Sequence, residues 1–469
     1  MLDGCRPGGA QQLIGALLAL EFGLVHVVGR TRGLYGVAAL AVLSACFAGC
    51  YIALAWQRAP GTATRFAGVL GILLVVATLW LHWRREPLTF PVVENYAALK
   101  APAVYAAVLL SWGWIVGLRP PGRFLIMLGI ALFGCFLVGQ LWRSPHPLED
   151  VPTVSTEATQ RLLSGGNPYT ALYTDVFEQA GYSRAPYAMH YVYLPGLMLH
   201  FAIPVALGLD VRWAGLAMQV AGLALFASCV PLARHGRKFW APLAAGAAVL
   251  LFWVQNGQAL LLEHAWAESL VLFYLCLALW AWRKSGWVVA IALTLAFCSK
   301  QTAWFCGPFF IALAIRERRW RLIAAVAAGS VVLLAPFFLW NPAAFFRNVI
   351  IEHLGKSPRP DGLSWPAFFL RNGPGAVPWV AALSFLAYAF AFGAFIAQLR
   401  RPERDGLMEA HKWMVLGMFG LLLFANQAFS NYYYLMVGLL AFYIVRCAGG
   451  EYAPAAGSEL PAPLAGRPS

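Results

Sequence analysis

The sequence predicts an all-α fold, a polytopic bundle of about fourteen transmembrane helices with two long external loops that contain short interfacial helices. Hydrophobic residues make up 61% of the 469 positions and charged residues 12%, and the mean hydropathy is +0.67. Water-soluble domains of this size do not reach such values. Apolar runs near the length of about 20 residues that crosses a bilayer also recur along the chain. These spans must be helices, because a bilayer offers no water to bond the backbone polar groups.

The formal charge of +14 does not indicate nucleic-acid binding in this chain. Arg and Lys gather in short loops between apolar runs, as the enrichment of basic residues in cytoplasmic loops produces. The clusters that orient the core are Arg234-Arg237-Lys238, Arg283-Lys284, Arg316 to Arg321 and Arg400 to Arg404. We expect all of them on the cytoplasmic side of a lipid bilayer.

The chain divides into three parts. Residues 1–123 hold extra N-terminal spans, 124–446 form a membrane core with external loops 143–211 and 341–375, and 447–469 form a disordered tail rich in Pro, Ala and Gly. Basic residues flank the first spans on both sides, so the orientation of these spans stays open. The predicted spans with continuous apolar runs are 11–29, 35–56, 66–83, 102–118, 124–142, 212–233, 239–257, 262–282, 320–340, 376–398, 413–428 and 431–446.

Two further spans require a helix break at Ser299-Lys300-Gln301. One straight span between Lys284 and Arg316 would put two basic clusters on opposite sides of the membrane. Two helices of roughly 14 residues, each about 21 Å long, resolve this conflict. Lys300 then lies at membrane depth toward the external side, where its ammonium must face a polar cavity or a partner. The alternative reading is that Lys300 snorkels from a helix end.

Counting membrane crossings between the basic clusters in the same way predicts that the segment Tyr191 to Leu209 starts and ends on the external side. This segment should therefore not cross the membrane. Pro195 and Pro204 are expected to break this segment into pieces too short to cross. Earlier in the same loop, apolar residues at helical spacing predict a short amphipathic helix over 154–164. Gly165-Gly166 would end that helix.

Function is expected where charge is expensive, and the ionisable residues concerned all map to the external face. These candidates are Glu149, Asp150, Glu263, His264, Glu268, Lys300, Arg347, Lys356 and Arg359. A carboxylate that takes a proton from a hydroxyl and a cation that offsets phosphate charge are what glycosyl transfer from a lipid phosphate requires. The plain alternative is that Glu149 and Asp150 are ordinary interfacial charges and that the cations of the second loop only solvate it.

No cofactor and no metal site are expected. Glu263, His264 and Glu268 would be the ligands of a divalent cation, but a Glu-His pair with a carboxylate four residues on is weak ligand spacing. Helix-end capping and charge pairing explain these three residues better. The run of tyrosines at 432–434 is interpreted as part of an interfacial aromatic belt.

Several segments within residues 124–446 carry a family resemblance. They are the acidic pair Glu149-Asp150 just after a span, "LLSGGNPY" (Leu162 to Tyr169), "YVYLPGL" (Tyr191 to Leu197), "NGQ" (Asn256 to Gln258), "CSKQTAW" (Cys298 to Trp304) and "NPAAFF" (Asn341 to Phe346). Their order and spacing resemble the polyprenyl-phosphate-sugar-dependent integral membrane glycosyltransferases of the C-type (GT-C) superfamily, in particular the bacterial mannosyl- and arabinofuranosyltransferase-like branch. Leu194 stands where that branch has the first proline of Y-x-YPP, and extra spans precede the helix that is normally first.

The resemblance implies a hexosyl- or pentosyltransferase of a bacterial inner membrane, with a polyprenyl-phosphate-sugar donor and a glycan, lipid or protein acceptor. It implies Asp150, or else its neighbour Glu149, as the catalytic base. Donor-phosphate contacts are expected from Lys300, Arg347, Lys356 and Arg359, and substrate-loop contacts from Asn167, Tyr169, Tyr193, Glu263, His264 and Glu268. The alternatives are a transporter or flippase of lipid-linked sugars, for which discontinuous helices and internal symmetry are typical, and a non-catalytic membrane assembly protein.

Overall fold

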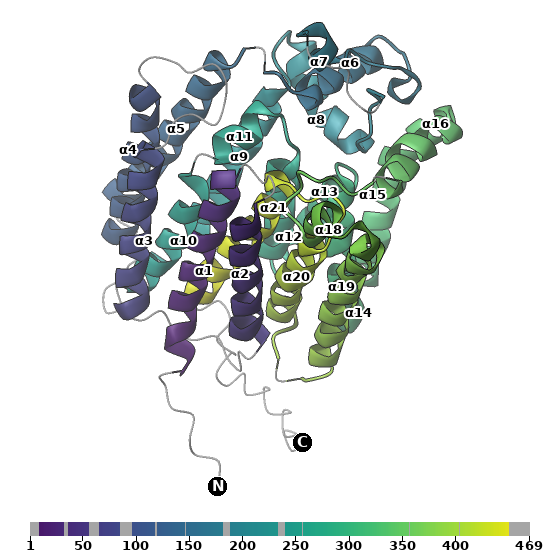
Figure 1. The fold of residues 1–469 in the computed structure, drawn as a ribbon. Helices are drawn as coiled ribbons and strands as arrows, with labels where there is room; N and C mark the ends of the chain where they lie inside the picture. The colour runs from purple at the N-terminus through teal and green to yellow at the C-terminus, as the bar shows by residue number, and fades with distance from the viewer. Residues whose placement is uncertain are drawn as a thin grey trace, which may run out of the picture.

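The computed structural model describes residues 9–31, 36–55, 65–84, 96–117, 120–145, 147–181, 188–232, 240–255, 257–355, 357–402 and 404–449. Every regular element in these ranges is helical, which confirms the predicted all-α class. Most helices pack side by side as a bundle, and α6 (Asp150–Leu163), α7 (Val176–Gln179) and α8 (Pro195–Ala206) lie across one end of it (Figure 1). The expected disordered tail falls largely outside the described residues, since the last described helix runs to Gly449.

Five long helices precede the first loop. They are α1 (Gly9–Thr31), α2 (Val37–Ala55), α3 (Arg65–Arg84), α4 (Tyr96–Val116) and α5 (Pro120–Arg143). Their bounds follow the predicted spans closely, because each helix is one unbroken apolar run. The exception is α4, which begins at Tyr96 and keeps Pro102 inside the helix.

The remaining helices form the second half of the bundle and its second loop. After the short 3-10 helix η1 (Pro168–Thr170), they are α9 (Arg212–Cys229), α10 (Trp240–Trp253), α11 (Gly257–Glu263), α12 (Glu268–Ala281), α13 (Gly286–Phe297), η2 (Gln301–Cys306), α14 (Gly307–Arg316), α15 (Trp320–Trp340), α16 (Pro342–Phe346), η3 (Arg347–Ile351), α17 (Glu352–Leu354), α18 (Trp365–Asn372), η4 (Pro374–Ala376), α19 (Val377–Leu399), α20 (Gly406–Leu423) and α21 (Ser430–Gly449). Most match the predicted spans.

Three predicted spans need correction. The span 262–282 begins inside α11, and α12, which fills the rest of it, starts only at Glu268. The span 239–257 ends early at Trp253, and α11 follows it after a bend of 43°. The span 413–428 is α20, which begins and ends earlier. Its start is fixed by Asp405, whose carboxylate accepts hydrogen bonds from the backbone N–H groups of Leu407 and Met408 at 3.0 and 3.3 Å. Such a cap starts the helix ahead of the apolar run from which the span was predicted.

Three of the basic turns meet at one end of the bundle. Arg283 pairs with Asp405 at 2.7 Å, and Arg316 Nη2 donates to the carbonyl oxygen of Arg404 at 3.2 Å. The turns after α12, α14 and α19 therefore lie together, as expected for clusters on one side of a membrane. We call this the basic end; it lies opposite α6, α7 and α8 in Figure 1. The fourth cluster, 234–238, lies outside the described residues.

The segment predicted not to span forms one short helix at the α6–α8 end. With 12 residues, α8 is about 18 Å long, well short of the roughly 30 Å of a hydrocarbon core. Pro195 occupies the first turn, where its missing N–H costs nothing. The prediction that Pro204 breaks the segment is wrong, because Pro204 lies inside α8 near its end. Upstream, α6 starts at Asp150, four residues before the predicted 154, and Gly165 follows it with φ +83°.

Five described helices are long and apolar enough to cross a membrane, and the bent pair α10 and α11 would make a sixth. The five are α2, α3, α5, α15 and α19. Other core helices, such as α12 and α13 with 14 and 12 residues, are apolar but shorter. The chain therefore has the helices of a membrane protein, while the count of about fourteen spans and the external placement of the loops stay predictions.

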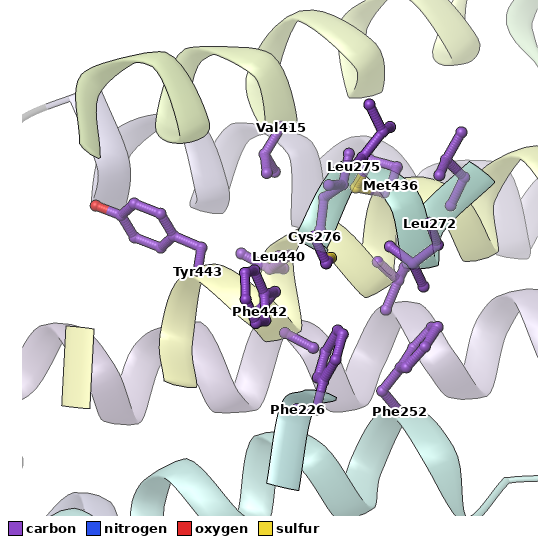
Figure 2. Packing of buried hydrophobic residues seen from close by; sticks show 14 of the residues in the cluster. Phe226, Phe252, Leu272, Leu275, Cys276, Val415, Met436, Leu440, Phe442 and Tyr443 are labelled. Atoms are coloured by element: carbon purple, nitrogen blue, oxygen red, sulfur yellow. The ribbon is translucent and has the colours of Figure 1, made fainter. Parts of the chain in front are cut away.

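A closely packed apolar core lies below the site. Figure 2 shows Leu272, Leu275 and Cys276 of α12 near Met436 and Leu440 of α21. These five side chains are at most 2% exposed. The helices α12 and α21 both start with polar residues. Farther along each helix, toward the basic end, the residues belong to this apolar layer.

Candidate functional site

The helix is interrupted at Lys300, as predicted from the placement of the basic turns on one side of the membrane. α13 ends at Phe297, Lys300 has an extended backbone with φ −150° and ψ 139°, and η2 begins at Gln301. The start of α8 packs on this break, where the N–H of Gly196 donates to the Cys298 carbonyl oxygen at 2.7 Å. A Cβ at position 196 would lie 2.5 Å from that oxygen, so this contact requires glycine.

The partner of Lys300 is Glu268, the first residue of α12. Lys300 Nζ lies 2.5 Å from Glu268 Oε1, and the two side chains are 5% and 1% exposed. Asn431 Nδ2 donates to the same carboxylate oxygen at 2.8 Å. A buried charge that is paired and hydrogen-bonded is tolerated where a lone one is not. Lys300 is therefore a buried, oriented ammonium and does not snorkel to the surface.

Tyr193 connects Lys300 with the predicted catalytic base. Lys300 Nζ lies 5.4 Å from the centroid of the Tyr193 ring and 5.1 Å from that of Tyr432, within the range of a cation–π contact. Burial and, after it, the negative charge of Asp150 raise the pKa of the Tyr193 phenol well above its ordinary value. Asp150 is partly buried in the first turn of α6. Tyr193 is thus within cation–π range of Lys300 and within the electrostatic reach of Asp150.

Glu149 belongs to a different cluster, which joins the end of α5 to α11. Its Oε2 lies 3.0 Å from His264 Nδ1, and Ser144 Oγ donates to Glu263 Oε1 at 2.8 Å. The buried Arg212 closes this cluster by donating to the carbonyl oxygen of Ser144 at 2.6 Å. Glu149 therefore contacts His264, whereas its neighbour Asp150 influences Tyr193. Arg212 also pairs with Asp210 at 2.7 Å, and its importance was missed because its bond to Ser144 joins segments far apart in the sequence.

The segment from Asn167 to Tyr169 (NPY) holds the backbone of Tyr193 in place. Asn167 Oδ1 accepts a hydrogen bond from the N–H of Tyr169 at 2.9 Å, which makes the turn expected of these residues. Tyr169 is fully buried, and its hydroxyl donates to the carbonyl oxygen of Tyr193 at 2.8 Å. Asn348 Nδ2 donates to the carbonyl oxygen of Tyr169 at 2.8 Å. These bonds position the loop, while direct substrate contacts by Asn167 or Tyr169 stay predictions.

Gln301 joins both long loops to the helix break. Its Nε2 donates to the carbonyl oxygens of Val192 and Val349 at 2.9 and 3.1 Å. The His353 ring lies against the same Val192 oxygen, with 3.0 Å from Nε2. Segments that are far apart in the sequence therefore meet at Lys300.

The predicted cations of the second loop are placed unequally. Arg359 pairs with Asp361 at 2.6 Å, and its charge, like that of Lys300, acts on Tyr432. Arg359 is thus a second cation near the site. Arg347 is exposed in η3, and Lys356 lies outside the described residues.

The tyrosines at 432–434 are not an interfacial belt. Tyr433 and Tyr434 are at most 1% exposed, and the Tyr433 hydroxyl donates to the carbonyl oxygen of Leu363 at 2.7 Å. Asn431 and Tyr432 contact the Lys300 pair directly. The sequence did contain a signal for Asn431, because it is a polar residue at the start of an apolar helix. Glu268 was selected as a candidate in the same kind of position.

The three residues considered as cation ligands have separate partners. Glu263 bonds to Ser144, His264 approaches Glu149, and Glu268 pairs with Lys300. Within the described ranges, no group of three His, Cys, Asp or Glu side chains is placed to hold a metal ion.

Comparison of the chain with protein-family models, with curated proteins and with solved structures finds no match. The function is therefore inferred from the geometry around Lys300 and from the resemblance of the sequence motifs.

Proposed function

We propose that the protein is a membrane glycosyltransferase of the GT-C type. It would move a sugar from a polyprenyl-phosphate donor to an acceptor hydroxyl at the α6–α8 end, on the periplasmic face of a bacterial inner membrane. The observation that carries the proposal is that Lys300 lies within cation–π range of the Tyr193 ring, while the negative charge of Asp150, from a distant part of the chain, raises the pKa of the same phenol. A carboxylate and a buried ammonium in one place are the two groups that the transfer needs.

In this reaction the acceptor oxygen forms a bond to the anomeric carbon as the bond from that carbon to the phosphate oxygen breaks. Asp150 takes the hydroxyl proton, and the bonding electron pair leaves with the phosphate. Lys300 uses one of its three N–H donors for Glu268, which leaves donors for the phosphate oxygens. Arg359, whose charge reaches Tyr432, would add a second positive charge.

Transport of lipid-linked sugars remains the competing function. The bend between α10 and α11 and the break at Lys300 are discontinuities of the kind found in transporters. A transport path, however, needs polar groups on both sides of the binding site. Beneath Glu268 and Asn431, the helices continue as Leu272, Leu275 and Met436, packed and buried (Figure 2). This layer favours a site that opens at one end only.

The proposal is tested by mass spectrometry of lipid-linked sugars and envelope glycans from cells with and without the protein. We expect cells that lack it to accumulate one polyprenyl-phosphate sugar and to lose the matching sugar from one glycan. Purified protein in liposomes should then transfer that sugar to the glycan. Unchanged lipids and glycans would contradict the proposal, and movement of the donor between leaflets without transfer would favour transport.

A further inference from the structure

We propose that Glu268 and Asn431 recognise the sugar of the lipid-linked donor by accepting hydrogen bonds from its hydroxyl groups. This inference rests on the proposed glycosyl transfer. The new element is the pair of residues that would distinguish a sugar-bearing lipid from the bare polyprenyl phosphate.

Two buried oxygens beside Lys300 lack a hydrogen-bond donor within the described part of the chain. Glu268 uses Oε1 for both Lys300 Nζ and Asn431 Nδ2, so its Oε2 is unused. Asn431 gives its amide nitrogen to Glu268, so its Oδ1 is unused as well. Glu268 is 1% exposed and Asn431 is 6% exposed. A buried acceptor without a donor leaves its desolvation uncompensated, and Glu268 and Asn431 are bonded to each other beside the ammonium of Lys300. We take this pair to indicate a ligand that supplies donors.

The chemistry of the two oxygens selects the ligand. Both are acceptors, so they suit hydroxyl groups, whereas the oxygens of an ionised phosphate are also acceptors and suit Lys300. A metal ion is a poor fit, because Lys300 already offsets the charge of Glu268 and the described residues hold no third acidic, His or Cys ligand there. Neighbouring hydroxyls of a sugar ring would match a carboxylate and an amide oxygen carried by two side chains that are bonded to each other.

The position of the pair fits the order of groups in the donor. The phosphate would lie at Lys300, and the sugar would lie against Glu268 and Asn431. Tyr193 and Tyr432 are both partly exposed. Their rings would flank the path by which the sugar reaches Glu268 and Asn431. Asp150, in the first turn of α6, raises the pKa of Tyr193 by its negative charge and would receive the proton of the acceptor hydroxyl.

The test compares binding of two kinds of lipid to the purified full-length protein in nanodiscs. One kind is a panel of polyprenyl-phosphate hexoses and pentoses, and the other is sugar-free polyprenyl phosphate. We expect the wild type to bind at least one sugar-bearing lipid more tightly than the bare lipid. Glu268→Gln keeps the shape but turns one acceptor into a donor, so this preference should fall about 10- to 100-fold. Glu317→Gln makes the same change at the basic end and should leave the preference unchanged.

A second variant separates recognition from folding. Asn431→Leu has nearly the same size, removes the amide oxygen and leaves the pair of Lys300 and Glu268 in place, so it should reduce the preference in the same direction. Folded variants that keep the full preference would overturn the inference and leave the proposed transfer intact. A wild type that binds neither kind of lipid would instead overturn the proposed function, and the inference with it.

Discussion

At the scale of single residues, the adjacent carboxylates Glu149 and Asp150 differ in what they contact. Glu149 approaches His264, whereas the charge of Asp150 acts on Tyr193 beside the buried ammonium of Lys300. Neighbours in a chain point their side chains in different directions, and here each direction leads to a distinct cluster. Of the two, only Asp150 influences the pKa of a residue that also contacts Lys300, the group proposed to hold the phosphate.

We therefore expect Asp150→Asn to lower turnover by roughly 10²- to 10⁴-fold with donor binding largely retained, because the amide cannot take the acceptor proton. Glu149→Gln should cost much less. The measurement is the rate of sugar transfer by purified protein with saturating donor. Loss of activity in Glu149→Gln alone would identify Glu149 as the base, and full activity of both variants would remove this loop from catalysis.

The buried pair also predicts a stability difference. Lys300→Met leaves Glu268 as an uncompensated buried charge, which typically costs about 3–5 kcal/mol. The double variant Lys300→Met/Glu268→Gln removes both charges and should be clearly more stable than the single variant. Thermal unfolding in detergent measures the difference. Equal melting temperatures would show that the two charges are not coupled.

The same double variant tests the role of Lys300 in binding. It should bind bare polyprenyl phosphate more weakly than Glu268→Gln alone, since the cation is gone. Donor titration of the folded proteins measures this, and unchanged affinity would remove Lys300 from the phosphate site. The need for a charged partner at Lys300 was predictable from its depth. The identity of that partner was not, because hydropathy does not show that the start of α12 packs beside the break after α13, and Asn431, which also bonds to Glu268, comes 163 residues later in the sequence.

At the scale of elements, the helix break at Lys300 is built by α8. The N–H of Gly196 bonds to the exposed carbonyl oxygen of Cys298, and Gln301 bonds to both loops. The break itself was predictable, because two basic turns on one side of a membrane require an even number of crossings between them. Its support by α8 was not, since close backbone packing at a glycine leaves no hydrophobic pattern in the sequence.

Gly196→Ala should separate α8 from the break. Its new Cβ would lie 2.5 Å from a backbone oxygen, which cannot move without shifting the segment that carries Lys300. We expect a loss of about 1–3 kcal/mol in stability and reduced transfer. Gly373→Ala is the matched control, because a Cβ there meets no atom within 4 Å. Equal melting temperatures for the two variants would contradict the contact.

At the scale of the whole molecule, the two ends of the bundle differ in character. Three basic turns meet at one end, and α6, α7 and α8 cover the other (Figure 1). Long spans such as 320–340 were predicted to the residue, because an unbroken apolar run has clear limits. The short α11 and the early start of α20 were not, since a bend and a side-chain cap depend on particular contacts rather than on hydropathy.

The two ends should lie on opposite sides of the membrane. Single cysteines at Gln179, before α8, and at Leu209, after it, should both react with an impermeant thiol reagent added outside, in a background without native cysteines. A cysteine at Arg401 in the basic end should react only after permeabilisation. All three positions are exposed. Labelling of only one of the first two would show that the segment crosses and that the orientation of the core is wrong.

The pairing of Lys300 with Glu268 has a consequence for biogenesis. Glu268 opens α12 and Lys300 follows α13, so the two charges lie at the open ends of one helical hairpin. A single charged side chain placed at the centre of an inserting helix costs about 2.5–3.5 kcal/mol. A hairpin that enters the translocon with its charges already joined avoids much of this cost. Because Asn431 is synthesised 131 residues after Lys300, we expect the ion pair to form before the last helix is in place.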